Sequence, residues 1–283
     1  MGRRGVREGG SQEDRKAALL VALRQEDARR PQLVTSAAQD SKARAGLSEG
    51  RKVVLALQAG ARESQDARRP QSTESWGRPS VNSVEPLLRD LQARGLPPPR
   101  LVIGDGHLGI WAALRGIYPQ AKEQRCWNHR IVNVLDRIGR RDQPAARELL
   151  RQVAYAPTLP AAERNRRAFQ AWGPQRGYPE AGRLLDQDGE RMLTFYRFPQ
   201  EHWGHVRTTN PVESPFAALR LWTVAAKRFK KMENATAVIW KLLLLAERRI
   251  RRLNALELLA EVWKGTQFVD GVRVPDHPQQ AAA

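Results

Sequence analysis

Apolar residues form short runs and helical stripes from about residue 50 onward. The run at residues 53–57 is rich in β-branched side chains and predicts a strand, and residues 100–103 predict a second, buried strand. A helix through Leu87 and Leu91 is expected between them, and another over about residues 107–116 after them. This alternation of strands and helices is typical of an α/β fold with a parallel pair of strands.

The pattern changes after the second predicted helix. From about residue 128 to 195 the apolar spacing is almost wholly helical. Beyond Asn210 it predicts one helix to about Lys231 and another from about Ala235 to Arg252. The second of these places five apolar residues on one face, namely Val238, Ile239, Leu242, Leu245 and Ala246.

The first 50 residues have a different composition. They are rich in Arg, Gln, Ser, Asp and Gly, and we expect this region to be poorly ordered, with residues 18–23 able to form one amphipathic helix. The hexapeptide Asp-Ala-Arg-Arg-Pro-Gln occurs at residues 27–32 and again at residues 66–71. Such a match indicates a duplicated or shifted piece of coding sequence.

The charge of the chain points to its partner. Lys and Arg number 48 against 30 Asp and Glu, which gives a formal net charge of +18. An excess of this size favours a polyanion such as double-stranded DNA, although a merely basic cytosolic protein is the simpler alternative. We expect no membrane association, because no run of about 18 apolar residues and no amino-terminal signal region is present. One cysteine excludes an intramolecular disulfide and suits a reducing cytoplasm.

Basic residues are densest between residues 207 and 252, where eleven Lys or Arg stand against three Glu. A solvated helix face is the ordinary explanation for such a run. Here the density favours a surface that binds the DNA backbone. The residues predicted to contact DNA are Arg207, Lys227, Arg228, Lys230, Lys231, Arg248, Arg249, Arg251 and Arg252.

Two carboxylates are the candidates for catalysis and metal binding. Asp105 follows the predicted strand at residues 100–103, and Glu213 falls in the first turn of a predicted helix. Together they could hold a divalent metal for phosphoryl transfer, which suggests a DNA-cutting enzyme. Each also has a structural explanation. Asp105 lies in a Gly-Asp-Gly turn, and Asn210 with Glu213 forms a capping-box pattern.

Cys126 and His129 resemble half of a zinc site, and His202 and His205 could in principle complete it. Because the chain has no second cysteine, the usual sites with two or four cysteines are excluded within one chain. The sequence favours a structural role instead, in which these residues pack and hydrogen-bond near the acids.

A family resemblance rests on motifs that recur in order between about residues 50 and 274. The motifs are Gly50-Arg-Lys52, Arg62-Glu-Ser64, Arg94-Gly-Leu96, Gly104-Asp-Gly106, Gln124-Arg-Cys-Trp-x-His129, Phe198-Pro-x-Glu-His-Trp203, Arg207-Thr-Thr-Asn-Pro-Val-Glu-Ser214 and Phe268-Val-Asp-Gly271. With these motifs in this order, the chain resembles the Mutator-type transposases of bacterial insertion sequences.

The resemblance implies a transposase with a ribonuclease H-like core interrupted by an all-helical insertion. It implies a DDE triad that uses Mg²⁺ or Mn²⁺, with Asp105 as the second acid and Glu213 as the third. Cys126 and His129 match the family's Cys-x-x-His motif. The implied activity is metal-dependent cleavage at the element's ends followed by strand transfer into target DNA. The enzyme would act as a homo-oligomer on DNA in the bacterial cytoplasm, associated with the nucleoid.

On this basis the chain divides into five parts. Residues 1–50 are the poorly ordered region, residues 51–127 a partial ribonuclease H-like core, and residues 128–200 the helical insertion. Residues 201–274 carry the third acid and the basic helices, and residues 275–283 form a tail.

The amino-terminal part departs from the family. The family's first Asp lies on an opening strand, whereas here Asp27 and Asp40 stand in charged surroundings without a strand pattern. We therefore expect a truncated or frameshifted copy that lacks core strands and is catalytically impaired. The alternative function is a non-catalytic DNA-binding remnant. In either case the resemblance predicts that Asp105 and Glu213 lie close together.

Overall fold

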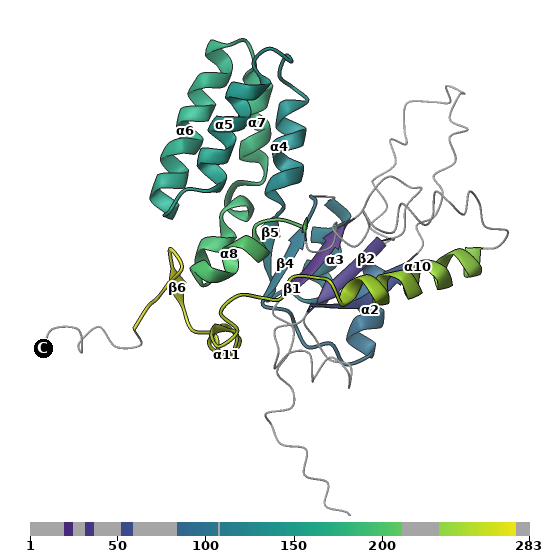
Figure 1. Ribbon diagram of the computed structural model, residues 1–283. Coiled ribbons are helices and arrows are strands. Elements are labelled where there is room, and N and C mark those ends of the chain that lie inside the picture. Colours follow the sequence, from purple (N-terminus) through teal and green to yellow (C-terminus); the bar gives the residue numbers. More distant parts are fainter. Residues whose placement is uncertain are drawn as a thin grey trace, which may run out of the picture.

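The computed structural model describes residues 20–24, 32–36, 52–58, 84–106, 108–210 and 232–275. Its centre is a five-stranded mixed sheet in the order β3-β2-β1-β4-β5 (Figure 1). The strands are β1 (Leu20–Arg24), β2 (Gln32–Ser36), β3 (Val53–Gln58), β4 (Leu101–Gly104) and β5 (Lys122–Arg125). β1, β2 and β3 pair antiparallel, while β1 pairs parallel with β4, and β4 parallel with β5.

β4 shows why the sheet needs layers on both faces. All four of its residues are buried, which is typical of a central parallel strand rather than of one that faces solvent. Leu101 and Ile103 belong to one hydrophobic core, and Val102, which points to the opposite face, belongs to another. The sheet therefore has a separate apolar core on each side.

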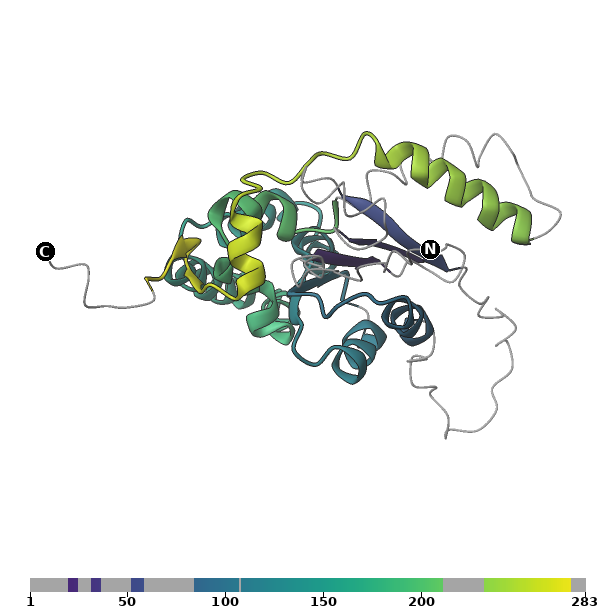
Figure 2. The ribbon, with the colours of Figure 1, turned by 90° about the horizontal axis from the view of Figure 1, so that it is seen from below.

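Helices supply these two cores. α2 (Glu85–Ala93) and α3 (Leu108–Ile117) lie on one face of the sheet, where they bury Leu88 and Trp111. α10 (Met232–Glu247) crosses the other face and packs against β3 (Figure 2). Its Leu243 joins the same core as Val54, Leu101 and Ile103. The result is a three-layer α/β/α arrangement around the sheet.

A helical unit follows β5. It consists of α4 (Trp127–Leu135), α5 (Gln143–Ala154), α6 (Leu159–Gln175) and α7 (Pro179–Gln187), which stand side by side beyond one end of the sheet (Figure 1). Leu150, Val153, Phe169 and Leu185 are almost fully buried within it. Apolar residues at helical spacing thus form the core of this unit, as the sequence predicted.

Short elements complete the described part of the chain. Three 3₁₀ turns, η3 (Gly189–Met192), η4 (Thr194–Arg197) and η5 (Gln200–His202), lead into α8 (Trp203–Val206). After α10 come α11 (Leu258–Lys264) and a two-stranded sheet of β6 (Phe268–Val269) and β7 (Val272–Arg273). Among the residues in these ranges, no helix is both long and apolar enough to cross a membrane.

The predicted mixture of helices and strands is confirmed, including the strands at residues 53–57 and 100–103 and the helices between and after them. The expectation of a helix at residues 18–23 is wrong, because residues 20–24 form β1. The expectation that strands preceding residue 50 are missing is also wrong, since β1 and β2 occupy the middle of the sheet. The remainder of the expected poorly ordered region lies outside the described residues.

The final long helix also differs from its prediction. α10 ends at Glu247, not near Arg252. Of its predicted apolar face, Ile239 and Leu242 pack against the core, whereas Val238 and Leu245 are 42% and 49% exposed. Leu243, which the prediction left out, is fully buried. This helix is apolar on nearly every side, so the spacing of its residues does not define which side meets the sheet.

Candidate active-site region

Asp105 lies at the edge of the sheet where parallel strands β4 and β5 end. It follows Gly104, the last residue of β4, and is half-buried. The next residue, Gly106, has a φ of +100°, and a Cβ atom there would lie 1.9 Å from Cζ of Arg125. Glycine is therefore required at this position, and the guanidinium of Arg125 packs directly against the turn that presents Asp105.

Arg125 belongs to a buried cluster of charges. Its Nε is 3.0 Å from Oδ2 of Asp188, and Arg130 forms an ion pair with the same oxygen. Burial lowers the pKa of Arg125, opposed by the nearby Asp105, and burial together with Arg125 lowers the pKa of Arg130 to about 10. The cluster holds two cations against one carboxylate, so it supplies positive charge beside Asp105.

Cys126 joins two segments that are distant in sequence. Its backbone N–H donates to the carbonyl of Gly104 at 2.8 Å. Its Sγ accepts hydrogen bonds from the backbone N–H of Thr209 at 3.2 Å and from the Thr209 hydroxyl at 3.1 Å. The Thr209 hydroxyl also lies 3.4 Å from Nδ1 of His129. Burial raises the pKa of the Cys126 thiol, but hydrogen bonding and charge from His129, with Thr209, outweigh it and leave the pKa below its ordinary value.

Residues next to Cys126 and Thr209 form further hydrogen bonds between the same two segments. Trp127 N–H donates to the carbonyl of Arg207 at 3.2 Å, and Asn128 Nδ2 donates to Oδ1 of Asn210 at 2.6 Å. The start of α4, residues 126–129, is therefore bound to residues 207–210 along its length. We call this set of contacts the α4 clamp.

Arg207 is a core residue in this structure. It is 8% exposed, and its guanidinium lies 4.3 Å from the ring centroid of Tyr155 and 4.8 Å from that of Phe195. Burial lowers its pKa, and the aromatic faces compensate part of its lost hydration. The predicted phosphate contact of Arg207 does not agree with this placement, because aromatic rings cover the group that would make it.

His202 and His205 contact a different set of residues from those that Cys126 contacts. His202 is fully buried and hydrogen-bonds the carbonyl of Ala255 at 3.2 Å. Nδ1 of His205 is 2.8 Å from Nζ of Lys52, and Nε2 accepts from the N–H of Asn254 at 3.3 Å. Burial, with Lys52, lowers the pKa of His205 to about 4, and burial lowers that of Lys52 to about 8.

The described positions of Cys126, His129, His202 and His205 do not form a zinc site. Within the described ranges, no group of three or more His, Cys, Asp or Glu residues is arranged to hold a metal ion. Cys126 and His129 both contact Thr209. His202 and His205 contact Ala255, Lys52 and Asn254.

Several predicted residues lie outside the described residues. These are Glu213, Lys227, Arg228, Lys230 and Lys231, together with Asp27 and Asp40. The proximity of Asp105 and Glu213 therefore stays a prediction. Arg248, Arg249, Arg251 and Arg252 are described, and all four are exposed just after α10.

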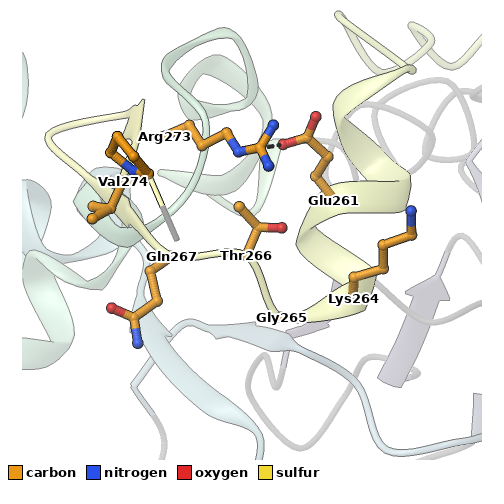
Figure 3. Close-up of a pocket in the computed structure, with 8 residues that line it drawn as sticks. Glu261, Lys264, Gly265, Thr266, Gln267, Arg273 and Val274 are labelled. Carbon is orange, nitrogen blue, oxygen red and sulfur yellow. Dashed lines mark ion pairs between the residues drawn. The ribbon is translucent and has the colours of Figure 1, made fainter. Parts of the chain in front are cut away.

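A polar cavity of about 700 Å³ lies elsewhere, between α11 and the β6–β7 sheet (Figure 3). Arg273 and Glu261 face each other across it, with Nε and Oε2 3.6 Å apart, and Lys264 stands on the same helix as Glu261. Asp105 and the α4 clamp do not line this cavity. It has no evident part in the chemistry expected at the sheet edge.

Sequence reasoning missed the roles of Arg125, Asp188, Thr209 and Lys52. Arg125 and Thr209 stand inside motifs that mark the region, but the motifs do not say what these side chains contact. Asp188 has no motif around it. Its partners Arg125 and Arg130 come from β5 and α4, so only the folded chain brings the three together.

Comparison with known proteins identifies the family. The family described as "Transposase, Mutator family" matches residues 20–248. A transposase for insertion sequence element IST2 of Acidithiobacillus ferrooxidans is 37% identical over 240 residues, which are 83% of this chain and 75% of that protein. A transposase for IS6120 of Mycolicibacterium smegmatis is 38% identical over 225 residues, 79% of this chain and 64% of that protein. The chain thus spans three quarters of the first relative and just under two thirds of the second. The chain belongs to the Mutator family of transposases.

Proposed function

We propose that this chain acts on DNA in the transposition of an insertion sequence and that this copy is catalytically impaired. The observation that carries the proposal is the position of Asp105, which follows a fully buried parallel strand next to the centre of the sheet. Open α/β sheets bind their ligands at the carboxyl ends of such strands. The membership of the family and its insertion-sequence relatives support a role in transposition.

The sheet supports the finer proposal of a ribonuclease H-like core. Three antiparallel strands, β3, β2 and β1, are followed by the parallel strands β4 and β5, with helices on both faces. A helical unit then separates β5 from α10, which returns to the sheet. This is the arrangement expected of such a core interrupted by a helical insertion.

Asp105 and Glu213 would hold Mg²⁺ or Mn²⁺ in the proposed reaction. Carboxylate oxygens are the ligands that these ions prefer. When bound, such ions activate an attacking oxygen and stabilise a leaving one during phosphoryl transfer. Asp105, on a rigid strand end packed by Arg125, would orient one carboxylate toward the ions.

The proposed impairment rests on β1. The family's first acid is expected on the opening strand, but β1 has the sequence Leu-Val-Ala-Leu-Arg and contains no acid. Its residues pair with β4 up to Leu23 beside Gly104, so that Arg24 follows on β1 where Asp105 follows on β4. This observation also favours the second candidate function, a DNA-binding remnant without catalysis.

An in vitro cleavage and strand-transfer assay with element-end DNA and Mn²⁺ tests the catalytic part. The unmodified chain should give little or no product, as should Asp105→Ala and Glu213→Ala. Robust activity that both substitutions abolish would support the transposase and refute the impairment. In that case Asp27 or Asp40 would be the acid to test next.

Double-stranded DNA, both element ends and target, is the proposed partner, bound by a homo-oligomer in the nucleoid-containing cytoplasm of a bacterium. The exposed arginines after α10 and the net charge of +18 support contact with phosphates. We expect tight binding with little sequence preference and strong salt dependence. Reversing Lys227, Arg228, Lys230 and Lys231 to Glu should weaken binding to all sequences and reduce the salt slope by about 3 to 4.

A matched control separates local contact from net charge. Arg140, Arg141, Arg164 and Arg167 are exposed on the helical unit, and reversing them to Glu changes the net charge equally. This control should lower affinity much less than the reversal at residues 227–231. Equal losses in the two variants would contradict a localised DNA-binding surface.

A further inference from the structure

We propose that Lys52 and His205 are positioning residues, which hold the segment after α10 so that its arginines form one surface for a DNA backbone. This segment comprises residues 248–254, and we call it the arginine segment. The proposal rests on the proposed function, in which the exposed arginines after α10 contact phosphates. It gives a role to Lys52 of the Gly50-Arg-Lys52 motif and to His205, neither of which takes part in the proposed reaction.

The arginine segment lies between two helices and belongs to neither. α10 ends at Glu247, and α11 begins at Leu258. An irregular segment loses conformational entropy when it is ordered by a ligand, and this loss reduces affinity unless the segment is already held in place. Four of its residues are exposed arginines, namely Arg248, Arg249, Arg251 and Arg252.

Hydrogen bonds from the sheet side and from α8 hold the main chain of this segment. Nζ of Lys52, which directly precedes β3, donates to the carbonyl of Arg251 at 2.7 Å. The N–H of Asn254 donates to Nε2 of His205, which lies in α8, at 3.3 Å. Both contacts use backbone atoms of the segment. The guanidinium of Arg251 therefore remains at the surface, while its backbone is fixed from below.

Lys52 and His205 also bind each other, which makes the two contacts one unit. Nζ of Lys52 is 2.8 Å from Nδ1 of His205. A backbone N–H can only donate, so Nε2 of His205 must accept from Asn254, and the neutral ring then carries its proton on Nδ1. Lys52 accepts that proton only as a neutral amine. Burial and the nearby Arg251 lower the pKa of Lys52 to about 8, which brings this form within reach of ordinary pH.

Simple packing would not require these two side chains. Lys52 is 6% exposed and His205 is 4% exposed, and burial disfavours the charged form of each. An apolar pair could fill the same space without that cost. Only polar atoms, however, can satisfy the carbonyl of Arg251 and the N–H of Asn254. The two residues are thus suited to holding the backbone of the arginine segment.

Hydrogen exchange of the full chain tests the link itself. In His205→Leu the Asn254 amide should exchange about tenfold faster, and His205→Gln, whose amide oxygen can accept, should restore part of the protection. Val206→Ala is the matched control, because Val206 is also buried in α8 but has an apolar side chain. An unchanged Asn254 amide in His205→Leu, or an equal acceleration in Val206→Ala, would overturn the proposal.

Binding of duplex DNA at about pH 9 tests the consequence for the arginines. Lys52 is mainly neutral at this pH, so Lys52→Met removes little charge. Lys52→Met and His205→Leu should each weaken binding about fivefold, and Val206→Ala should change it little. Lys52→Met also serves as the second variant if His205→Leu does not fold.

A double-mutant cycle shows whether Lys52 acts through the arginines. In a chain that carries Arg248→Gln, Arg249→Gln, Arg251→Gln and Arg252→Gln, adding Lys52→Met should weaken DNA binding less than about twofold. An equal loss in both backgrounds, or no loss in either, would overturn the positioning role and leave the proposed function intact. If the four substitutions alone left DNA binding unchanged, the phosphate contacts proposed for this segment would be rejected, and the positioning role with them. Exchange at Asn254 would still show whether His205 holds the segment.

Discussion

The sheet and the helical unit are built from contacts of very different range. In the helical unit, α5 packs on α6 and α6 on α7, so each helix meets its neighbour in the chain. In the sheet, Leu20 pairs with Leu101, and α10 comes from beyond residue 230 to cover β3. The helical unit can therefore assemble from one continuous stretch, whereas the edge with Asp105 depends on segments from both ends of the chain. A change in coding sequence near the amino terminus would affect the sheet first.

The largest expected effect on stability comes from breaking the charge cluster that joins the sheet to the helical unit. Arg125 belongs to the sheet, Arg130 to α4, and Asp188 follows α7. In Asp188→Ala two buried arginines would lose their carboxylate, which should lower the free energy of unfolding by about 3 to 5 kcal/mol. Urea unfolding followed by tryptophan fluorescence and circular dichroism measures the change.

Asp186→Ala is the control, since Asp186 is 52% exposed and its ion pair with Arg166 lies at the surface. Its substitution should cost no more than about 1 kcal/mol. If Asp188→Ala were as mild as the control, the cluster would not hold the two regions together, and they could unfold independently.

A smaller effect, a dependence of stability on pH, should appear only in the unfolding of the sheet. His205, with a pKa of about 4 against an ordinary 6.5, connects Lys52 before β3 to Asn254 after α10. As the pH falls from 6.5 to 4, the unfolded chain binds a proton that the native histidine does not. Stability should therefore fall across this window, by about 3 kcal/mol.

His205→Gln removes the titrating group while keeping a polar side chain. The free energy of unfolding of this variant should depend less on pH between 6.5 and 4. An identical slope in the two proteins would show that other groups cause the acid sensitivity. If the two regions unfold in separate steps, only the step of the sheet should carry this dependence.

The smallest effect is local to the helical unit. Thr158 is the N-cap of α6, and its hydroxyl accepts from the N–H of Ala161 at 3.4 Å. Thr158→Ala should lower the free energy of unfolding by about 1 kcal/mol, and Thr158→Ser should recover most of it. Hydrogen exchange should accelerate at the start of α6 and stay unchanged in β4. Faster exchange in β4 would mean that the two regions are more tightly coupled than their contacts suggest.

The same difference in range explains what the sequence could predict of the fold. The spacing of Leu150 and Val153 shows the core of α5 directly, because a helix buries residues of its own stretch. The run of β1 is only five residues long and comes after Ala17, Ala18 and Leu19, so its pattern suits a helix equally well. What makes it a strand is pairing with β2 and β4, and a pattern within one segment does not contain that information.

The candidate site divides in a similar way. The position of Asp105 after a buried strand followed from the local run of apolar residues, and the structure places it there. The surroundings of Arg207 did not follow, because Tyr155 and Phe195 come from two other elements. A basic residue in a basic segment suggested a surface contact, and only the fold shows that aromatic rings enclose it.

The hydrogen bond between β3 and α10 has a consequence for synthesis. β3 stands at one end of the strand order, and the N–H of its Val54 donates to the carboxylate of Glu247, 193 residues later. At about 5 to 20 residues per second, a ribosome needs about 10 to 40 seconds to make that interval. During this time a nascent chain presents that strand edge to other strands, including those of chains on neighbouring ribosomes. Each new molecule would pass through this interval before Glu247 of its own chain could accept the hydrogen bond from Val54.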